Sequence, residues 1–214
     1  GPETPLLAIA ETIQTAHPDA EFLWIGTKDG PERELVERVG IAFSYLPVGK
    51  FRRYASVRNI TDAWRVIVGF FSAYRRMRHD RPIMCISAGG FVSVPVHYAA
   101  CLLGIPTWIH QQDVDVGLAN RMMGVIADCV TTSLEEHHQK FNKQKTRWIG
   151  NPVREEIFLG LGTVARATFG ITSNLPVVFV MGGGTGSLRV NQLITEALPH
   201  LEGIRKTFFL FQAP

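Results

Sequence analysis

The sequence predicts an α/β protein built on parallel β-sheet, followed by the beginning of a second domain of the same kind. Short apolar runs rich in β-branched and aromatic residues recur without polar alternation, as in strands buried on both faces. Helix-like segments stand between these runs, and this alternation is typical of a parallel sheet with helices on both faces. A fresh apolar run at 176–181 then opens a second strand–helix–strand pattern.

The predicted elements follow from these patterns in chain order. We expect strands in the first domain at residues 21–26, 43–48, 82–88, 106–111, 128–133 and 146–150. Helical periodicity or helix-capping residues predict helices at 4–16, 30–40 and 92–104. In the second domain we expect a strand at 176–181, a helix at about 191–201 and a strand at 206–211.

The domain limits that we predict are 1–155 and 156–214, with a linker near 150–175. The chain opens with Gly1 rather than Met and leads directly into a helix, whereas the first strand of a doubly wound sheet lies in the middle of the sheet. We therefore expect a central strand to be missing and the second domain to be truncated. The chain is interpreted as part of a longer protein, although a Gly-Pro start equally fits a tag-cleavage scar.

Composition excludes several classes of protein. With 214 residues, 46% of them hydrophobic, the chain can bury a sizeable core. No apolar stretch reaches the roughly 18 residues of a membrane-spanning helix, and no secretory leader is recognisable. The three cysteines lie in apolar contexts without metal-ligand spacing, so we expect buried thiols rather than disulfides or zinc ligands. Neither a metal nor a cofactor is predicted.

Positive charge is concentrated in residues 50–81, which carry nine basic and two acidic side chains although the net charge of the whole chain is only +3. From Ile60 onward, apolar residues recur at three- and four-residue steps among arginines, which predicts a basic amphipathic helix. Such a helix suits an anionic bilayer surface, although part of its apolar face could simply pack on the sheet. No nucleic-acid-binding motif accompanies the charge, so no nucleic-acid partner is predicted. The predicted membrane-contact residues are Arg52, Arg53, Trp64, Arg65, Phe71, Arg75 and Arg76.

A glycine cluster, MGGGTGS at 181–187, follows the strand of the second domain and precedes its helix. Glycines allow backbone N–H groups to approach an anion, and a helix N-terminus favours negative charge. The cluster is a candidate diphosphate cradle, although it matches neither the lysine-containing phosphate loop nor the spaced dinucleotide motif. A tight strand-to-helix turn remains the alternative.

Three further motifs lie at predicted strand ends or at the domain junction. Gly89 and Gly90 follow a buried strand and precede a helix, either to bind a ligand or to allow close packing. The polar run from His110 to Asp113 ends another strand and needs hydrogen-bond partners, which favours recognition of a polar ligand. Arg154 emerges after an Asn-Pro turn, either as a surface arginine or as a guanidinium that reaches a phosphate.

Taken in order, these motifs resemble the MurG family of peptidoglycan glycosyltransferases. The similarity covers nearly the whole chain and is carried by PLLAIAE, FLWIGTKDGPERELVERVGIAF, SAGGFVSVPV, LLGIPTWIHQQDVDVGLANR, GNPVREEI and MGGGTGS with the following NQ. The resemblance implies a GT-B fold of two Rossmann-like domains. It also implies inverting transfer of N-acetylglucosamine from UDP-N-acetylglucosamine to undecaprenyl-diphosphate-linked muramoyl-pentapeptide, which converts lipid I to lipid II without an essential metal, at the cytoplasmic face of the bacterial membrane.

The resemblance also implies roles for individual residues and names the partners, which are UDP-N-acetylglucosamine, lipid I and anionic inner-membrane lipids. The donor-binding residues would be Gly1, Asp113, Arg154, Gly182, Gly183, Gly184, Thr185, Gly186, Asn191 and Gln192. The acceptor-binding residues would be Gly89, Gly90, Phe91 and His110.

The sequence departs from the family pattern at several of these places. Pro2 stands where the family's first glycine loop usually carries a histidine, the favoured general base. His110 and Glu3 are the candidate substitutes in this sequence, and we predict His110. His-Gln-Gln-Asp at 110–113 replaces the usual His-Glu-Gln-Asn, and Gly184 replaces the usual serine of the cradle. The uridine and donor-sugar pockets that the family carries later in its C-terminal domain are absent from these residues, so the fragment alone is expected to be inactive. Alternatives are a GT-B enzyme with another acceptor, a UDP-N-acetylglucosamine epimerase, or a catalytically degenerate membrane-binding homologue.

Overall fold

The structure of the chain, a computed structural model, describes residues 3–28, 30, 32–46, 58–172, 174–182, 186–200 and 207–212; for residues 58–65 and for residue 208 it describes only the backbone. The chain divides into two compact units between Phe158 and Leu159. Each unit is described by itself, and we call them the N-terminal unit and the C-terminal unit.

In the described part of the N-terminal unit, the strands run parallel and form two sheets. A two-stranded sheet pairs β1 (Leu23–Gly26) with β2 (Ala42–Tyr45). A four-stranded sheet has the order β3 (Cys85–Ser87), β4 (Thr107–Gln111), β5 (Cys129–Thr132) and β6 (Thr146–Trp148). Because consecutive strands are neighbours in this sheet, their carboxyl ends all lie at one edge.

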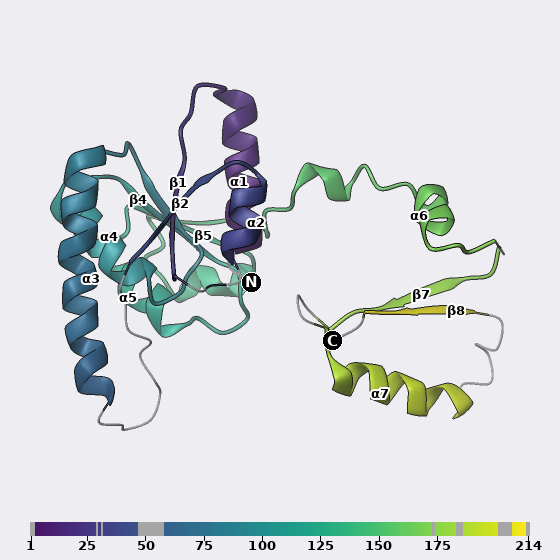
Figure 1. Ribbon diagram of the computed structural model, residues 1–214. Helices are drawn as coiled ribbons and strands as arrows, with labels where there is room; N and C mark the ends of the chain where they lie inside the picture. The colour runs from purple at the N-terminus through teal and green to yellow at the C-terminus, as the bar shows by residue number, and fades with distance from the viewer. Residues whose placement is uncertain are drawn as a thin grey trace. The chain divides into compact units, whose positions relative to one another are not determined.

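Helices connect these strands and cover them on both sides. Figure 1 draws α3 and α4 on one side of the strands and α1 and α2 on the other. The helical segments of the N-terminal unit are α1 (Glu3–Ala16), α2 (Glu32–Arg38), α3 (Arg58–Asp80), α4 (Ser93–Leu102), α5 (Leu118–Ile126) and the short 3-10 turns η1 (Glu135–Gln139) and η2 (Glu155–Ile157).

One hydrophobic cluster joins the two sheets of the N-terminal unit. Leu46, next to β2, packs with Ala73 and Met77 of α3 and with Cys85 of β3, and all four side chains are less than a tenth exposed. Partly buried Ile25 of β1 packs on the same cluster. The helices α3 and α4 therefore cover both sheets with a continuous apolar core, which supplies the main stabilising contribution.

The four-stranded sheet uses its two faces differently. Ile109 of β4 and Val130 of β5 are fully buried against α4 and α5. On the opposite face Trp108 lines a shallow hollow of about 260 Å³ together with α1 residues and with Pro152 and Val153. Because side chains alternate along a strand, His110 shares the α1 face with Trp108.

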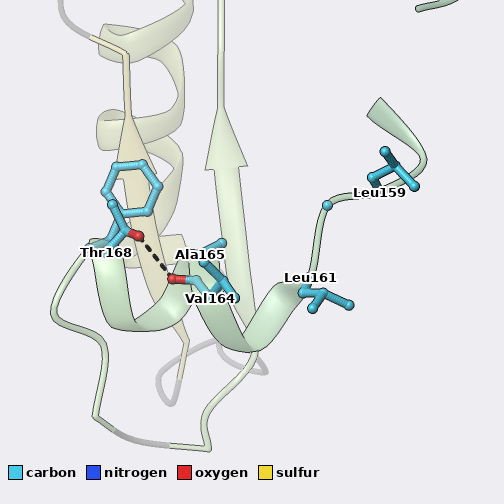
Figure 2. A pocket seen from close by; sticks show the side chains of 7 residues that line it. Leu159, Leu161, Val164, Ala165 and Thr168 are labelled. Atoms are coloured by element: carbon cyan, nitrogen blue, oxygen red, sulfur yellow. Dashed lines mark hydrogen bonds between the residues drawn. The ribbon is translucent and has the colours of Figure 1, made fainter. Parts of the chain in front are cut away.

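The C-terminal unit is a single strand–helix–strand arrangement preceded by a helix. Strands β7 (Val177–Val180) and β8 (Phe208–Phe211) pair in parallel. Phe179 of β7 and Leu193 of the helix between the strands are largely exposed. Figure 2 shows a hollow of about 350 Å³ beside the first helix, lined by side chains including Leu161, Val164 and Thr168, whose hydroxyl donates to the Val164 carbonyl. Among the described residues of this unit, the side chains that line the hollow are uncharged. The elements of the unit are α6 (Gly162–Thr168), β7 (Val177–Val180), α7 (Leu188–Ala197), the 3-10 turn η3 (Leu198–His200) and β8 (Phe208–Phe211).

The predicted parallel α/β architecture is confirmed, and each predicted strand and helix is present with somewhat different ends. The helix predicted at 191–201 begins earlier, at Leu188, because Ser187 caps it by accepting a hydrogen bond from the Val190 amide at 3.3 Å. Helix α5 lies between two predicted strands, where the alternating pattern expects a helix, but no residue range was predicted for it. Its segment contains Gly117, Asn120 and Gly124, which weaken the helical signal, and burial of Met123 in the core outweighs that weak propensity.

His97 of α4 makes the stability of the fold sensitive to acid. It is fully buried, neither ring nitrogen has a hydrogen-bond partner among the described residues, and burial lowers its pKa from 6.5 to about 4. The unfolded chain therefore binds a proton that the folded state excludes in this range. The stabilising contribution is complete above pH 6.5 and is lost as the pH falls toward 4.

We expect the free energy of unfolding to fall by about 2 kcal/mol through His97 when the pH drops from about 7.5 to about 5. His97→Leu, which keeps the site apolar and filled, should lose about 2 kcal/mol less than the wild type over the same interval. Urea unfolding at the two pH values measures both. An identical pH dependence in the two proteins would contradict the assignment.

Candidate functional site

The candidate site of the N-terminal unit lies at the carboxyl edge of the four-stranded sheet, where ligands bind in open α/β sheets. Gly89 and Gly90 follow β3, Asp113 follows β4, and the segment that begins at Gly150 follows β6. His110 occupies the fourth position of β4. The topology therefore brings residues from three separate segments to one edge.

The loop after β3 depends on two glycines with positive φ. Gly89 has a φ of 111° and Gly90 a φ of 91°, values that strain any residue with a Cβ. The Ser93 hydroxyl, in the first turn of α4, lies 2.6 Å from the Gly89 carbonyl oxygen and 2.7 Å from that of Gly90. This serine fixes the loop at the N-terminus of α4, and Phe91 in the same loop is exposed.

A buried amide pair fixes the loop after β4. The Gln111 side chain, 1% exposed, donates to the carbonyls of Asp113 at 2.7 Å and Asp115 at 3.2 Å. Its own carbonyl accepts a 2.7 Å bond from Asn120 of α5. The Asn120 Oδ1 atom has no partner in the described part of the chain and faces Gly89, where an added Cβ would lie 3.4 Å away. The Asn120 side chain thus lies between Gln111 and the loop after β3.

The imidazole of His110 is buried and engaged at both nitrogens. Nδ1 lies 2.9 Å from the Thr131 hydroxyl of β5, and Nε2 lies 3.2 Å from the Asn151 side-chain oxygen. The Thr131 hydroxyl oxygen also accepts a 2.8 Å bond from the indole N–H of Trp108. Burial lowers the pKa of His110 and outweighs the hydrogen bond to Asn151, which raises it, so the ring is neutral near pH 7.

The polar run from His110 to Asp113 finds the hydrogen-bond partners that its burial requires partly within the protein. The protein itself supplies partners for His110 and Gln111, which removes the cost of burying them. The Gln112 carbonyl accepts from Ser133, and only the Asp113 side chain is exposed at the edge. The predicted contact of Asp113 with the sugar-nucleotide donor stays a proposal.

Arg154 begins the turn η2 and forms an ion pair with Glu156 at 2.7 Å. Its side chain is 29% exposed, and its Nε atom is buried without a hydrogen-bond partner among the described residues. An ion pair with a partner as exposed as Glu156 contributes little stability, so an anionic ligand can compete with it. The guanidinium therefore has donors to offer a phosphate.

Gln212, which follows β8, contacts two residues on either side of the glycine cluster's undescribed part. Gly182 donates its backbone N–H to the Gln212 side-chain oxygen at 3.3 Å, and Asn191 donates to the Gln212 carbonyl at 2.9 Å. A Cβ on Gly182 would lie 2.2 Å from that of Ser187, so only glycine fits. The Gly182 amide thus binds the protein rather than pointing toward an anion. Gly186, with a φ of 73°, precedes the capped N-terminus of α7.

Several predicted site residues cannot be placed. Gly1, Arg52, Arg53, Gly183, Gly184 and Thr185 lie outside the described residues, as do the side chains of Trp64 and Arg65. Conversely, sequence reasoning missed Asn120, Thr131 and Asn151. Asn151 had been interpreted only as part of a turn, and the pairing of Thr131 with His110 across β4 and β5 has no signal in a single sequence.

Helix α3 separates its apolar residues between the core and the surface. Ala73 and Met77 are buried, whereas Ile67, Val68 and Phe71 are exposed, Phe71 by 64%. Arg75 and Arg78 follow Phe71 at four- and seven-residue spacing and therefore lie on the same exposed stripe. Part of the apolar face of α3 thus packs on the core, as the alternative interpretation expected, and an apolar stripe bordered by arginines remains on the outside.

Comparison with known proteins finds a protein family that matches the N-terminal part of the chain. Residues 3–132, more than half of the chain, match the glycosyltransferase family 28 N-terminal domain. The chain belongs to this family.

Curated relatives in the family carry one recurring name. A protein from Bacillus cereus is 36% identical and one from Shouchella clausii 37% identical over 201 residues, which is 94% of this chain and 56% of each relative. Both are named UDP-N-acetylglucosamine--N-acetylmuramyl-(pentapeptide) pyrophosphoryl-undecaprenol N-acetylglucosamine transferase, with the number 2 added in Bacillus cereus. These relatives confirm the resemblance to MurG. The chain spans about half the length of the curated relatives that it matches.

Solved structures show the fold of this family 28 chain. MurG from Acinetobacter baumannii superposes with a TM-score of 0.67 at 23% identity, over 94% of this chain and 55% of that one. UDP-GlcNAc 2-epimerase from Neisseria meningitidis, bound to UDP-GlcNAc, superposes with a TM-score of 0.64 at 11% identity, over 99% of this chain and 70% of that one. At these identities both similarities establish the GT-B fold alone.

The glycine loop after β3 provides a test of the site geometry in this family 28 domain. We expect Gly89→Ala to lower the free energy of unfolding by about 2 kcal/mol, because a Cβ is strained at its φ of 111°. Gly117→Ala is the matched control, since Gly117 has a φ of −64° and open space around it. Its loss, from a weaker helix cap, should be less than half as large.

Urea unfolding followed by tryptophan fluorescence measures both variants, because all four tryptophans, at positions 24, 64, 108 and 148, belong to the N-terminal unit. Equal losses in the two variants would show that the loop after β3 is not strained.

Proposed function

We propose that the protein to which this chain belongs transfers N-acetylglucosamine from UDP-N-acetylglucosamine to undecaprenyl-diphosphate-linked muramoyl-pentapeptide, which converts lipid I to lipid II in peptidoglycan synthesis. The observation that carries the proposal is 36% identity over 94% of the chain with relatives named for this reaction. The glycine-rich strand ends in both units support it, because each precedes a helix that is long enough to orient an anion.

In this proposal residues 156–214 begin the donor domain. The loop at 182–187 and the N-terminus of α7 hold the UDP diphosphate, with Gly186 allowing the turn into the helix. Gly182 contributes through its close approach to Ser187 rather than through its own amide, which Gln212 occupies. The remaining predicted donor contacts are Gly1, Asp113, Arg154, Gly183, Gly184, Thr185, Asn191 and Gln192.

Residues 1–155 form the acceptor domain in the same proposal. Gly89 and Gly90 shape the loop that receives the acceptor diphosphate at the N-terminus of α4, and Phe91 lies exposed beside it. Ser93 holds the two glycine carbonyls through its hydroxyl, which keeps these carbonyl oxygens turned toward the protein. Anionic oxygens are then met by backbone N–H groups rather than repelled by carbonyls.

The chemistry is a displacement with inversion. The 4-hydroxyl oxygen of the acceptor sugar bonds to the anomeric carbon while the bond from that carbon to UDP breaks and its electron pair leaves with the diphosphate. The hydroxyl proton passes to a base. His110 was the predicted candidate, but its two nitrogens are occupied by Thr131 and Asn151, so we do not assign the base to it.

For location, we propose peripheral association with the cytoplasmic face of the bacterial cell membrane through α3. Within the described ranges, no helix combines the length and the apolar character needed to cross a bilayer. The exposed stripe of Ile67, Val68 and Phe71 suits insertion at the headgroup boundary, and the neighbouring arginines suit anionic lipids.

Arg154 tests the donor site. In the full-length protein we expect Arg154→Ala to raise the KM for UDP-N-acetylglucosamine at least about tenfold, because a charge-assisted contact to phosphate is lost. Arg147→Ala, an exposed arginine on β6 that donates to backbone carbonyls, is the control and should leave this KM unchanged. An unchanged KM in both variants would count against the assignment.

Product analysis separates the transferase from the alternatives. With lipid I present we expect lipid II and UDP, and without lipid I no conversion of the donor. An epimerase would convert the donor without an acceptor, and a degenerate membrane-binding homologue would convert nothing.

Vesicle binding tests the membrane surface. Replacing Arg75 and Arg78 together by Gln should weaken binding to vesicles that contain phosphatidylglycerol by about tenfold or more, since each basic group near the surface contributes about 1 kcal/mol. The matched control replaces Arg33 and Arg38 of α2, two exposed arginines, by Gln. Equal weakening in the two double variants would indicate a general charge effect and contradict α3 as the contact surface.

A further inference from the structure

Four side chains form a row of hydrogen bonds in the order Trp108, Thr131, His110 and Asn151. Each of these bonds has a defined donor and acceptor. The Trp108 indole can only donate, so the Thr131 oxygen accepts from it at 2.8 Å. The Thr131 hydroxyl proton is then available for His110 Nδ1 at 2.9 Å. At the other end of the ring the Asn151 Oδ1 atom can only accept, so Nε2 carries the ring proton.

This direction makes His110 a poor proton acceptor. In the neutral ring, Nε2 donates to Asn151 and the lone pair of Nδ1 accepts from Thr131. Neither nitrogen offers a free lone pair to a substrate hydroxyl. The ring is also fully buried, so an attacking group cannot reach it without displacing Asn151.

The His110 ring also determines how the Asn151 amide is oriented. Because its Oδ1 atom is bound to the His110 ring, the amide plane is oriented and Nδ2 turns the opposite way. Asn151 is exposed, and its Nδ2 atom donates to no acceptor among the described residues. Gly150, with a φ of 79°, turns the chain at this point, and Pro152 follows. The sheet edge therefore presents two oriented N–H donors to solvent.

We propose that Asn151 is a ligand-contacting residue whose Nδ2 group donates to a diphosphate oxygen of the substrate, and that His110 is the positioning residue that orients it. The inference rests on the proposed function. It is supported by the place of Asn151 at the carboxyl edge of β6, three residues before Arg154. A neutral donor pair suits phosphate oxygens, and a preoriented amide does not lose rotamer freedom on binding.

Two diphosphates are chemically equivalent sources of this oxygen, namely that of the sugar nucleotide and that of the lipid acceptor.

The variant Asn151→Asp separates the contact with the ligand from the hydrogen bond to His110. Aspartate keeps an oxygen for His110 Nε2–H but replaces the two donors by a negatively charged oxygen that repels phosphate. Asn142→Asp is the matched control, since its side-chain oxygen likewise accepts a hydrogen bond, from Gln144 N at 3.0 Å, and it precedes β6 at the opposite edge.

The test uses the full-length protein with both substrates. In Asn151→Asp we expect the KM of one diphosphate substrate to rise at least tenfold, the donor KM if the contact is to the nucleotide and the acceptor KM if it is to lipid I. Asn142→Asp should stay within twofold of the wild type. If Asn151→Asp also leaves both KM values within twofold while the wild type turns over, the proposal is overturned.

The proton positions on the His110 ring can be measured independently of enzyme activity. Nitrogen-15 spectra of histidine-labelled protein should show His110 protonated at Nε2 and unprotonated at Nδ1 near pH 7. In Asn151→Asp the added carboxylate should raise the pH at which this ring takes up its second proton. A ring protonated at Nδ1 instead would overturn the proposal, because the Asn151 oxygen would then face outward. If the wild type neither binds nor converts UDP-N-acetylglucosamine, the proposed function fails and the ligand contact with it, whereas the spectra still report on the orientation of Asn151.

Discussion

Strand β4 pairs with β3 on one side and with β5 on the other, and the register of these pairings determines the candidate site of the N-terminal unit. Thr107 at the beginning of β4 receives support from Asp128, which accepts its backbone N–H at 2.8 Å and its hydroxyl at 2.9 Å. These bonds also lower the pKa of Asp128. At the other end His110 stands opposite Thr131. A slip of one residue would turn His110 toward α4 and α5 and Ile109 toward α1.

The same register explains how so many polar groups are tolerated at the end of a buried strand. Burying His110 and Gln111 without partners would be costly, and each instead takes part in a defined set of hydrogen bonds. One set joins β4 and β5 to the segment after β6, and the other joins β4 to α5 and the loop at 113–115. The polar side chains therefore act mainly as an inner support for the loops that meet a ligand.

Membership of glycosyltransferase family 28 and the GT-B fold agree with this arrangement, since both units carry a glycine-rich strand end followed by a helix. The two glycine turns use glycine for different reasons. Gly89 and Gly90 need positive φ angles, whereas Gly182 needs the absence of a Cβ beside Ser187. A glycine pattern in a sequence does not distinguish these causes, although they place the backbone N–H groups differently.

The sequence by itself determined the order and type of most elements, because burial on both faces leaves a strong apolar signature that is local in the chain. It also indicated the glycine loops, the basic helix and the family. Tertiary structure decided which apolar residues of α3 are buried, where α5 begins and ends, and which polar groups of the site satisfy one another. The partners of His110 lie 21 and 41 residues away, at Thr131 and Asn151. A hydrogen bond between side chains on separate segments depends on strand register and on the path of a loop, and neither is encoded in the local pattern of either segment.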